Sequence, residues 1–323
     1  MKMPETIRAQ PIPTLVMLQG LPGSGKSTVA NALSETYSKQ GRNVKIHSSD
    51  SLRKELYGDE NSQEHNGELF NELHRRMKED LNNGITVIYD ATNLSKKNRI
   101  AFLNEIKNIN CVKTCISMIT PFEDCLKMNA QRERKVPEEV IKRMYMNWQP
   151  PDYSEGFHII VFFYNFDKSE PNKWSLDNLL KEMADFNQEN KHHSLTLGEH
   201  CAKAEEYIRT HYPDNKNLCI AARIHDCGKP FTKTRINARG VEDGDCHYYQ
   251  HHCVGAYDSV LYLNSDEFEL NDIVYISNLI YYHMHPYTAW KQSEKSLNRD
   301  KKLLGEKFYE DVCKLHEADV YAH

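Results

Sequence analysis

The segment at residues 20–27 constrains the fold more than any other part of the chain. It reads GLPGSGKS, a complete G-x-x-x-x-G-K-S pattern, and lies between an apolar run at 14–19 and a helical pattern at 26–40. In such a setting the backbone N–H groups cradle the phosphates of a nucleoside triphosphate, the lysine reaches the β- and γ-phosphates, and the serine hydroxyl binds Mg²⁺. The expected binding residues are Gly20, Gly23, Ser24, Gly25, Lys26, Ser27 and Thr28.

Strand-length apolar runs alternate with helical patterns through the first half of the chain. This alternation predicts a parallel sheet flanked by helices. The strand signals stop after residue 164, and a polar, turn-rich segment follows at 167–172. The sequence thus predicts two separately folded domains, an α/β domain over residues 1–170 and an all-α domain over residues 171–323. Strands are expected at 14–19, 44–47, 85–89, 112–119 and 158–163, and C-terminal helices at 177–188, 197–211, 216–226, 250–263, 268–283 and 300–320.

Composition excludes several classes of protein. The nine cysteines form no C-x-x-C pair, which indicates reduced thiols rather than a disulfide framework. No apolar stretch approaches the ~18 residues of a membrane span, so we expect a soluble, cytoplasmic protein without a membrane partner. The formal net charge of -5 provides no global basic field, so a nucleic-acid substrate would need local basic residues. Candidates for such a wall are Arg75, Arg76, Lys96, Lys97, Arg99, Lys142 and Arg143.

Charged residues follow the expected strands at positions suited to group transfer. Asp50 comes just after the second strand, where it could accept a proton from an acceptor hydroxyl or simply cap a helix. Arg53 lies three residues further along a starting helix and could hold an acceptor phosphate. Asp90 ends the third strand, near Mg²⁺ or the acceptor, unless it only forms a turn. The basic segment at 131–135 reads as a lid over the transferring phosphate or as a solvated charge run.

Four of these segments together resemble a known family. The motifs GLPGSGKST, SDSLR, YDATNLSKKNR and NAQRERKVPEEVIKRMY, spread over about residues 14–165, are similar to the kinase domain of phage-type polynucleotide 5′-kinases. The resemblance implies that Lys26 and Ser27 bind ATP and Mg²⁺, that Asp50 is the general base for a 5′-hydroxyl and that Arg53 contacts the acceptor end. It implies Arg132 as the lid arginine, with Arg134 as an alternative because this lid is one residue shorter. The D-x-D-x-T phosphatase motif that follows the kinase in those phage enzymes is absent here.

A second set of motifs occupies the place of that phosphatase. The pieces LGEH, IHDCGKP, YYQHHCVGA, IYYHMH and ADVYAH follow in the order H…HD…H…H…D. They resemble the HD phosphohydrolase superfamily over about residues 190–323. The resemblance implies metal ligands at His200, His225, Asp226, His251, His283 and Asp319.

The chemistry of these side chains agrees with a metal site. Imidazole and carboxylate suit a divalent transition metal such as Mn²⁺, Ni²⁺, Co²⁺ or Zn²⁺, and two such ions can hold both the attacking hydroxide and the phosphate oxygens. Lys229 could neutralise the phosphate. A lone histidine is more often structural, and His285 is an alternative to His283.

The two motif sets together indicate an enzyme that adds a phosphate at one end of a nucleic acid and removes one from another. The leading hypothesis is an end-healing enzyme, with RNA a better substrate than DNA because ribonuclease cuts leave 5′-hydroxyl and 2′,3′-cyclic, 2′- or 3′-phosphate ends. No K-x-[DN]-G adenylation motif is found, so joining would need a separate ligase. The alternatives are a nucleoside or metabolite kinase fused to a nucleotide phosphohydrolase, and a kinase with a regulatory, nucleotide-binding HD domain.

Overall fold

The first half of the chain forms a five-stranded parallel sheet. The computed structural model describes residues 12–59, 64–167, 169, 173–189 and 195–323. The strands lie in the order β2-β3-β1-β4-β5, with every neighbouring pair parallel, which confirms the predicted sheet. All six residues of the central strand β1 are buried, as expected of a strand covered on both faces. The bounds are β1 (Thr14–Gln19), β2 (Val44–Ser48), β3 (Thr86–Asp90), β4 (Val112–Ile119) and β5 (Ile159–Tyr164).

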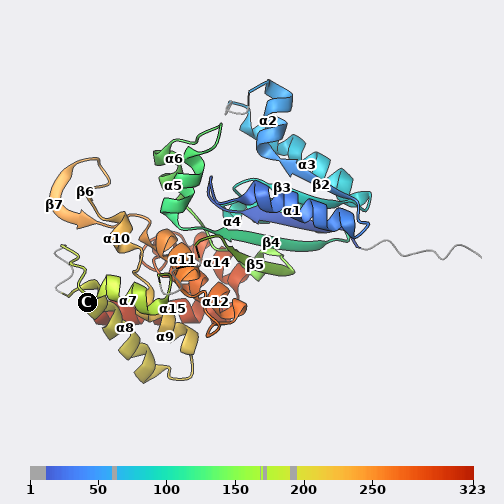
Figure 1. Cartoon of the computed structure of the whole chain (residues 1–323). Coiled ribbons are helices and arrows are strands. Elements are labelled where there is room, and N and C mark those ends of the chain that lie inside the picture. The colour runs from blue at the N-terminus through green and yellow to red at the C-terminus, as the bar shows by residue number, and fades with distance from the viewer. Residues whose placement is uncertain (1–11, 60–63, 168, 170–172, 190–194) are drawn as a thin grey trace, which may run out of the picture.

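Helices cover both faces of this sheet (Figure 1). Val16 and Leu18 of β1 pack against α1, whereas Leu15 and Met17 face the core that α3 and α4 help to build. This division follows from the alternation of side chains along a strand. The helical pattern of residues 62–82 predicts a helix there; the observed helix begins at Asn66, and residues 62 and 63 lie outside the described residues. The bounds are α1 (Lys26–Lys39), α2 (Ser49–Tyr57), α3 (Asn66–Asn82), α4 (Lys96–Glu105), α5 (Phe122–Ala130), α6 (Glu138–Tyr145) and the 3₁₀ helix η1 (Tyr153–Glu155).

The second half is mainly helical, but the expectation of an all-α domain is wrong. Strands β6 (Thr234–Ile236) and β7 (Glu242–His247) form an antiparallel hairpin that extends from the helices (Figure 1). Its strands are short and polar, so the sequence between residues 234 and 247 carried no strand signal, and Gly240 with a φ of 78° makes the turn. The helices are α7 (Leu176–Ala184), α8 (Leu197–His211), α9 (Lys216–Ile224), α10 (Lys229–Thr232), α11 (His251–Tyr262), α12 (Leu270–Tyr282), α13 (Ala289–Gln292), α14 (Glu294–Leu304) and α15 (Glu306–Ala322).

Two helix ends differ from the expected bounds in ways that matter for function. The helix expected over 216–226 stops at Ile224, so His225 and Asp226 lie in the turn that follows. The helix expected over 300–320 is interrupted at Gly305, whose φ of 86° ends α14 and starts α15. None of the described helices is long and apolar enough to cross a membrane.

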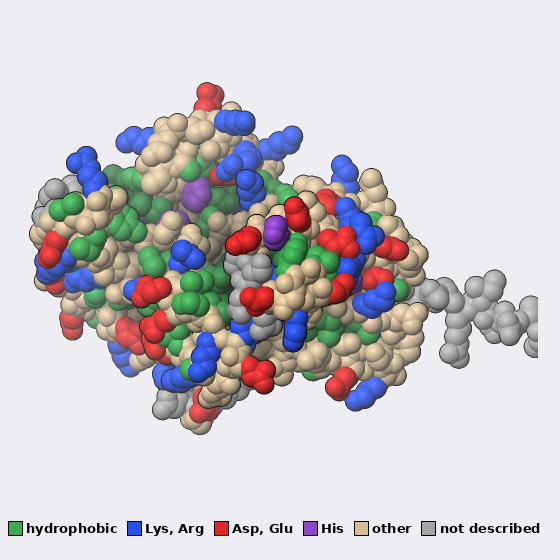
Figure 2. All heavy atoms as spheres, turned by 90° about the horizontal axis from the view of Figure 1, so that it is seen from above, with side chains coloured by type: hydrophobic (Ala, Val, Ile, Leu, Met, Phe, Trp, Pro, Cys, Tyr) green, Lys and Arg blue, Asp and Glu red, His purple; other side chains and the backbone are tan. Residues whose placement is uncertain are grey.

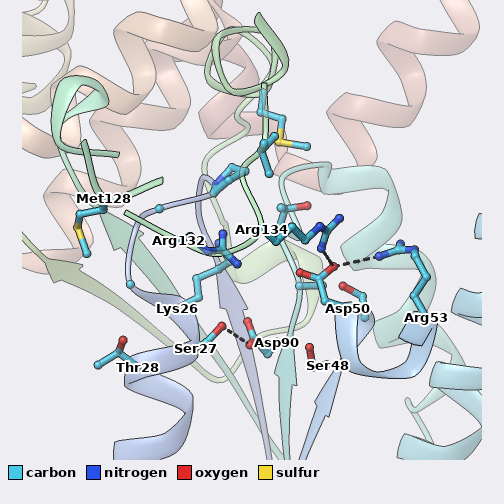
Figure 3. A pocket seen from close by; sticks show the side chains of 18 of the residues that line it. Lys26, Ser27, Thr28, Ser48, Asp50, Arg53, Asp90, Met128, Arg132 and Arg134 are labelled. Atoms are coloured by element: carbon cyan, nitrogen blue, oxygen red, sulfur yellow. Dashed lines mark hydrogen bonds and ion pairs between the residues drawn. The ribbon is translucent and has the colours of Figure 1, made fainter. Parts of the chain in front are cut away.

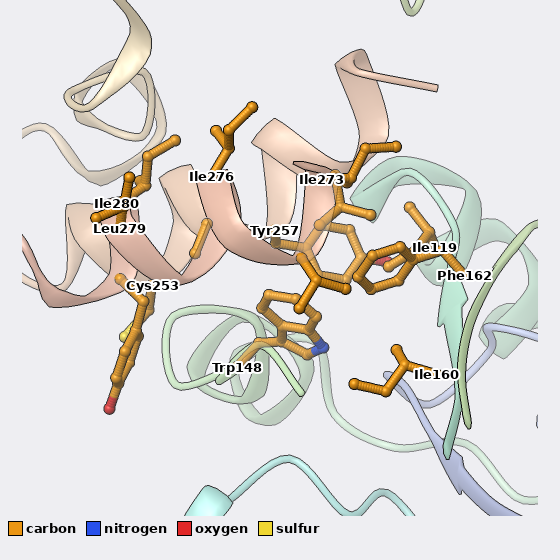
Figure 4. Close-up of a cluster of buried hydrophobic side chains, with 14 of the residues drawn as sticks. Ile119, Trp148, Ile160, Phe162, Cys253, Tyr257, Ile273, Ile276, Leu279 and Ile280 are labelled. Carbon is orange, nitrogen blue, oxygen red and sulfur yellow. The ribbon is translucent and has the colours of Figure 1, made fainter. Parts of the chain in front are cut away.

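The two halves are packed together through a shared buried core. Figure 4 shows Trp148, Ile119 and Phe162 from the first half beside Tyr257 and Ile273 from the second. The ring of Tyr257 meets that of Trp148 edge to face at 5.2 Å. The division at residue 170 stays a prediction, and part of the segment at 167–172 lies outside the described residues.

Two basic residues expected in an open nucleic-acid wall belong to this buried region instead. Lys96 is 5% exposed, and its ammonium donates a hydrogen bond to Asn278 Oδ1 at 2.9 Å in the other half. Arg99 is 1% exposed and forms an ion pair with Glu155 at 2.7 Å. Their positions at the start and in the first turns of α4 point them into the core, so the expectation for Lys96 and Arg99 is wrong.

A partly buried carboxyl lies at the contact between the halves. The hydroxyl of Tyr145, the last residue of α6, donates to Asp258 on α11. Burial raises the pKa of the Asp258 carboxyl to about 7, although the hydrogen bond from Tyr145 lowers it. In an unfolded chain the same carboxyl titrates near pH ~3.9.

We therefore expect stability to depend on pH through Asp258. Below pH ~4 the group is protonated in both states. As the pH rises towards 7, the unfolded chain loses its proton while the folded protein keeps it, so the free energy of unfolding falls. Asp258→Asn cannot ionise and keeps an acceptor for Tyr145. Melting temperatures of both proteins between pH 5 and 8 should show the variant gaining stability relative to wild type as pH rises, and a constant difference would contradict this assignment.

Candidate active sites

The P-loop adopts a conformation that only its glycines allow. Gly23 and Gly25 have φ values of 82° and 91°, and a Cβ on Gly23 would lie 2.2 Å from the carbonyl oxygen of Cys125. Parallel register places Asp90 of β3 beside Leu18 of β1, close to where the loop starts. As a result, Ser27 Oγ donates to Asp90 Oδ2 at 2.8 Å. This pairing is suited to sharing one Mg²⁺ ion.

A cavity of about 430 Å³ opens above the P-loop and extends to Asp50 and Arg53, the acceptor side of the expected reaction (Figure 3). The P-loop, the start of α2, the end of β3 and the segment after α5 all contribute to its walls. Ser24 is fully buried behind the loop and does not line the cavity. Lining residues expected from the sequence are Gly23, Gly25, Lys26, Ser27, Thr28, Asp50, Arg53, Asp90, Arg132 and Arg134. The sequence analysis missed Ser48, Asn66, Phe70 and Met128, which belong to no motif, and Met144, which lies in a quoted motif but was given no role.

Asp50 lies at the cavity and does not cap a helix. Ser48 is the N-cap of α2, with its hydroxyl accepting from the Ser51 N–H, so the alternative role of Asp50 as N-cap is wrong. Asp50 remains 41% exposed at the cavity, where its Oδ1 contacts Arg53 Nη1 at 3.0 Å. Arg53 in turn donates to Asn66 Oδ1 at 3.0 Å, which holds the guanidinium against α3.

The two candidate lid arginines occupy different parts of the cavity. Arg134 Nη1 lies 2.7 Å from Asp50 Oδ1, on the acceptor side. Arg132 lies beside Lys26 in Figure 3, on the side of the phosphates. Burial lowers the pKa of the Lys26 ammonium, the charge of Asp90 opposes that shift, and Arg132 adds to it. Both arginines therefore reach into the cavity, and the segment at 131–135 is more than a solvated charge run.

Two residues of the basic wall expected beside this cavity are neutralised by carboxylates. Arg75 pairs with Glu72 and Glu79, and Arg76 pairs with Glu55 and Glu72. Lys97, Lys142 and Arg143 are exposed. Figure 2 shows basic and acidic side chains interspersed over one face of the molecule.

The second site is built from the ends of separate helices. Hydrogen-bonding atoms of His200, His225, Asp226 and Asp319 lie within 4.8 Å of one another, and those of Asp226, His251 and His283 form a second such group. All six side chains are buried. His200 and Asp319 project from α8 and α15, and the turn after α9 splays His225 and Asp226 towards them. The structure thus brings together all six residues that the sequence singled out.

Asp226 joins the two groups. Its Oδ2 lies 3.3 Å from His225 Nε2 and 3.5 Å from His200 Nε2. Its Oδ1 lies 3.1 Å from His251 Nε2 and 3.6 Å from His283 Nε2. A carboxylate with one oxygen in each group is the arrangement of a bridging ligand between two cations.

The histidine tautomers follow from local hydrogen bonds. Nδ1 of His225, His251 and His283 lies 2.9, 2.7 and 2.6 Å from the carbonyl of the residue three positions earlier. A carbonyl only accepts, so each Nδ1 carries a proton and each Nε2 presents a lone pair to the group. Nε2 atoms of His251 and His283 nevertheless face each other at 3.1 Å. Two lone pairs at that distance repel unless a cation lies between them, so the donor set fits a divalent transition metal.

Neighbouring side chains hold the two carboxylates. Lys229 Nζ lies 2.6 Å from Asp226 Oδ2 and donates to Gln188 Oε1 at 2.8 Å. Although burial opposes ionisation, Lys229 and His225 hold the pKa of the Asp226 carboxyl well below its usual range. The hydroxyl of Tyr287 donates to Asp319 Oδ2 at 3.0 Å, which leaves Oδ1 for the histidines. The sequence analysis missed Gln188 and Tyr287 because neither belongs to a motif.

Between His283 and His285, the structure brings His283 into the group. His285 lies two residues further on, where its ring packs against those of Tyr282 and Trp290. Burial lowers the pKa of His285 to about 4. His285 is therefore a neutral core histidine.

The fold and the first site define a P-loop kinase. The family model described as chromatin associated protein KTI12 matches residues 13–204, more than half of the chain, and the protein belongs to this family. The kinase class implies ATP and Mg²⁺ as cofactors of the P-loop site.

Curated relatives match less than half of the chain. L-seryl-tRNA(Sec) kinase of Methanococcus maripaludis is 33% identical over 138 residues, which cover 42% of this chain and 53% of the relative. Protein kti12 of Schizosaccharomyces pombe is 25% identical over 150 residues, covering 43% and 52%. The chain spans about half the length of these relatives.

Solved structures are similar to parts of this chain at low identity. The Mycobacterium tuberculosis APS kinase CysC in complex with AMPPNP and APS is 19% identical, with a TM-score of 0.36 and coverage of 47% of this chain and 89% of that one. A chain of the Pnkp1/Rnl/Hen1 RNA repair complex is 22% identical, with a TM-score of 0.36 and coverage of 43% and 45%.

We expect Lys26→Ala to weaken binding of ATP·Mg²⁺ by about tenfold or more, because the P-loop ammonium that would reach the β- and γ-phosphates is lost. Titration of the full chain with a non-hydrolysable ATP analogue measures this. Lys127→Ala is the matched control, since Lys127 is an exposed lysine of α5 that pairs with Asp124. Equal affinities for the Lys26 variant and wild type would contradict the assignment of the P-loop.

Proposed function

We propose that the protein is a bifunctional enzyme that heals nucleic-acid ends, with RNA as the preferred substrate. The P-loop site would phosphorylate a 5′-hydroxyl, and the second site would remove a 2′,3′-cyclic, 2′- or 3′-phosphate. The observation that carries the proposal is the presence, on one chain, of a kinase cavity with an exposed carboxylate and a buried histidine–carboxylate group with a bridging aspartate.

In the kinase reaction the acceptor hydroxyl would lie between Asp50 and the γ-phosphate. Asp50 accepts its proton, the acceptor oxygen bonds to the γ-phosphorus, and ADP leaves. Lys26 and Arg132 would balance the charge on the transferring group. Arg53, buried against Asn66, is placed to hold the phosphate that follows the acceptor nucleoside.

In the phosphohydrolase reaction the chain would hold two ions. His200, His225 and Asp319 would hold one, His251 and His283 the other, and Asp226 would bridge them. Bound metal ions supply hydroxide at neutral pH and polarise the phosphate. Lys229 lies beside Asp226, where its ammonium can bind a phosphate oxygen while Gln188 keeps it in place.

A second candidate concerns the acceptor. The relative named L-seryl-tRNA(Sec) kinase is 33% identical over 138 residues, which favours a seryl hydroxyl carried on a tRNA as an acceptor for this cavity. Both acceptors are primary hydroxyls on RNA, so the P-loop chemistry is the same. A free nucleoside or metabolite acceptor, and a regulatory role for the second site, are the remaining outcomes of the test below.

The central test measures activity on each kind of nucleic-acid end separately. Oligonucleotides with 5′-hydroxyl, 3′-phosphate or 2′,3′-cyclic phosphate ends, as RNA and as DNA, are incubated with ATP and Mg²⁺ and, in parallel, with Mn²⁺, Ni²⁺, Co²⁺ or Zn²⁺. Seryl-tRNA and free nucleosides serve as competing acceptors. We expect 5′-phosphorylation in the first reaction and phosphate release in the second. Phosphate transfer to seryl-tRNA, with none to the 5′-hydroxyl oligonucleotides, would reject 5′-end phosphorylation and support the second candidate. If the ends are healed as proposed, a separate ligase would join them.

Asp50→Ala should cut the rate of phosphoryl transfer by about 10²-fold or more while ATP affinity stays near wild type, since it removes the base and leaves the phosphate cradle intact. Single-turnover transfer from labelled ATP to a 5′-hydroxyl oligonucleotide measures the rate. Asp124→Ala, an acidic residue of α5 outside the cavity, is the control. A wild-type rate in the Asp50 variant would show that another group takes the proton.

Asp226→Ala should remove both metal ions and the phosphohydrolase activity, because this carboxylate reaches both groups. His283→Ala should remove one ion, and both variants should keep kinase activity. Metal content by mass spectrometry and activity before and after chelation measure these effects. Full phosphate release by metal-free protein, or no release with any of the four metals, would reject the hydrolase and favour the regulatory role.

A further inference from the structure

A tyrosine of the helical half reaches the backbone that supports the P-loop. Tyr257 lies on α11, is completely buried, and its hydroxyl contacts both backbone groups of Thr120. The Thr120 N–H donates to the Tyr257 oxygen at 2.8 Å, and the Tyr257 O–H donates to the Thr120 carbonyl at 2.7 Å. Thr120 directly follows β4, beyond the last residue that pairs with β5. The hydroxyl thus takes the place of a strand partner.

Thr120 in turn holds the P-loop. Its Oγ1 donates to the carbonyl oxygen of Ser24 at 3.2 Å, and Asn165 Nδ2 donates to the same oxygen at 3.2 Å. A trans peptide is planar, so the Ser24 carbonyl and the Gly25 N–H point in opposite directions. Holding the carbonyl against the sheet therefore aims the Gly25 N–H away from it. Gly25 lines the cavity that would receive the phosphates.

We infer that Tyr257 is a positioning residue of the kinase site. It fixes Thr120, and through Thr120 the orientation of the P-loop peptide between Ser24 and Gly25. The ring is itself held from the kinase half, where Trp148 and Tyr145 meet it edge to face at 5.2 and 5.1 Å. Figure 4 shows Tyr257 between α12 and the end of β4 at Ile119. The ATP-binding loop is therefore completed by a side chain that the P-loop half does not contain.

The inference depends on one property of the proposed kinase, the binding of ATP, and is independent of the acceptor. Tyr257→Phe removes one oxygen and keeps the packed ring, so the buried N–H of Thr120 loses its partner while the core stays filled. We expect the affinity for ATP·Mg²⁺ to fall about tenfold, with the rise in KM for ATP exceeding any change in kcat. Metal content and phosphate release at the histidine site should stay at wild-type level.

Matched variants separate positioning from general stability. Tyr262→Phe makes the same change on the same helix, but the Tyr262 hydroxyl donates to Glu182 on α7 at 3.2 Å and touches no part of the kinase site. Thr120→Val removes the Oγ1 donor at constant volume and should resemble Tyr257→Phe. Thr120→Ser keeps the donor and should restore wild-type affinity.

The measurement is a titration of each full-length variant with a non-hydrolysable ATP analogue and Mg²⁺, well below the melting temperature. Wild-type protein that binds no ATP would reject the kinase and leave Tyr257 without a role. Wild-type affinity in Tyr257→Phe, or an equal loss of affinity in Tyr262→Phe, would overturn the positioning role itself. Loss confined to Tyr257→Phe and Thr120→Val supports it.

Discussion

Parallel pairing of the strands is the constraint on which the kinase site depends. Because all five strands run the same way, their carboxyl ends meet at one edge of the sheet. The P-loop follows β1, Asp50 comes two residues after β2, Asp90 ends β3 and Thr120 follows β4. One register, Leu18 beside Asp90, brings Ser27 Oγ and the Asp90 carboxylate to 2.8 Å. No long-range contact between side chains needs to be invoked to assemble these groups.

The histidine site is assembled differently, mainly from residues at the ends of helices. His225 and His283 are the C-caps of α9 and α12, His251 is the first residue of α11, and Asp226 lies in a turn. At a helix end the backbone departs from the helical direction, so adjacent residues can point at one centre, and nearby carbonyls accept from the Nδ1 atoms. The same hydrogen bonds fix the tautomers. The buried charge of Asp226 is compensated by the ammonium of Lys229, 2.6 Å away.

The sequence predicted most of the secondary structure and the candidate site residues, but few of the contacts between residues far apart in the chain. The sheet and the six metal-ligating candidates were visible because apolar periodicity and motif order are local signals. The β6–β7 hairpin was missed, since its short polar strands have no such signal. Lys96 and Arg99 were misplaced because a basic residue on a helix is normally solvated, whereas here Asn278 and Glu155 compensate their burial. Gln188 and Tyr257 act through contacts 41 and 137 residues away, which no local pattern records.

Helix α11 connects the two candidate sites. His251 begins the helix and Tyr257 lies six residues further on, a rise of about 9 Å. One rigid element thus contributes to the histidine site at its start and supports the P-loop from its middle. Asp258, next to Tyr257, accepts from Tyr145 at the end of α6, the helix that follows the lid arginines. Separating the halves would expose the shared core and withdraw the support of Thr120, so the boundary suggested by composition near residue 170 divides the chain but not the kinase site.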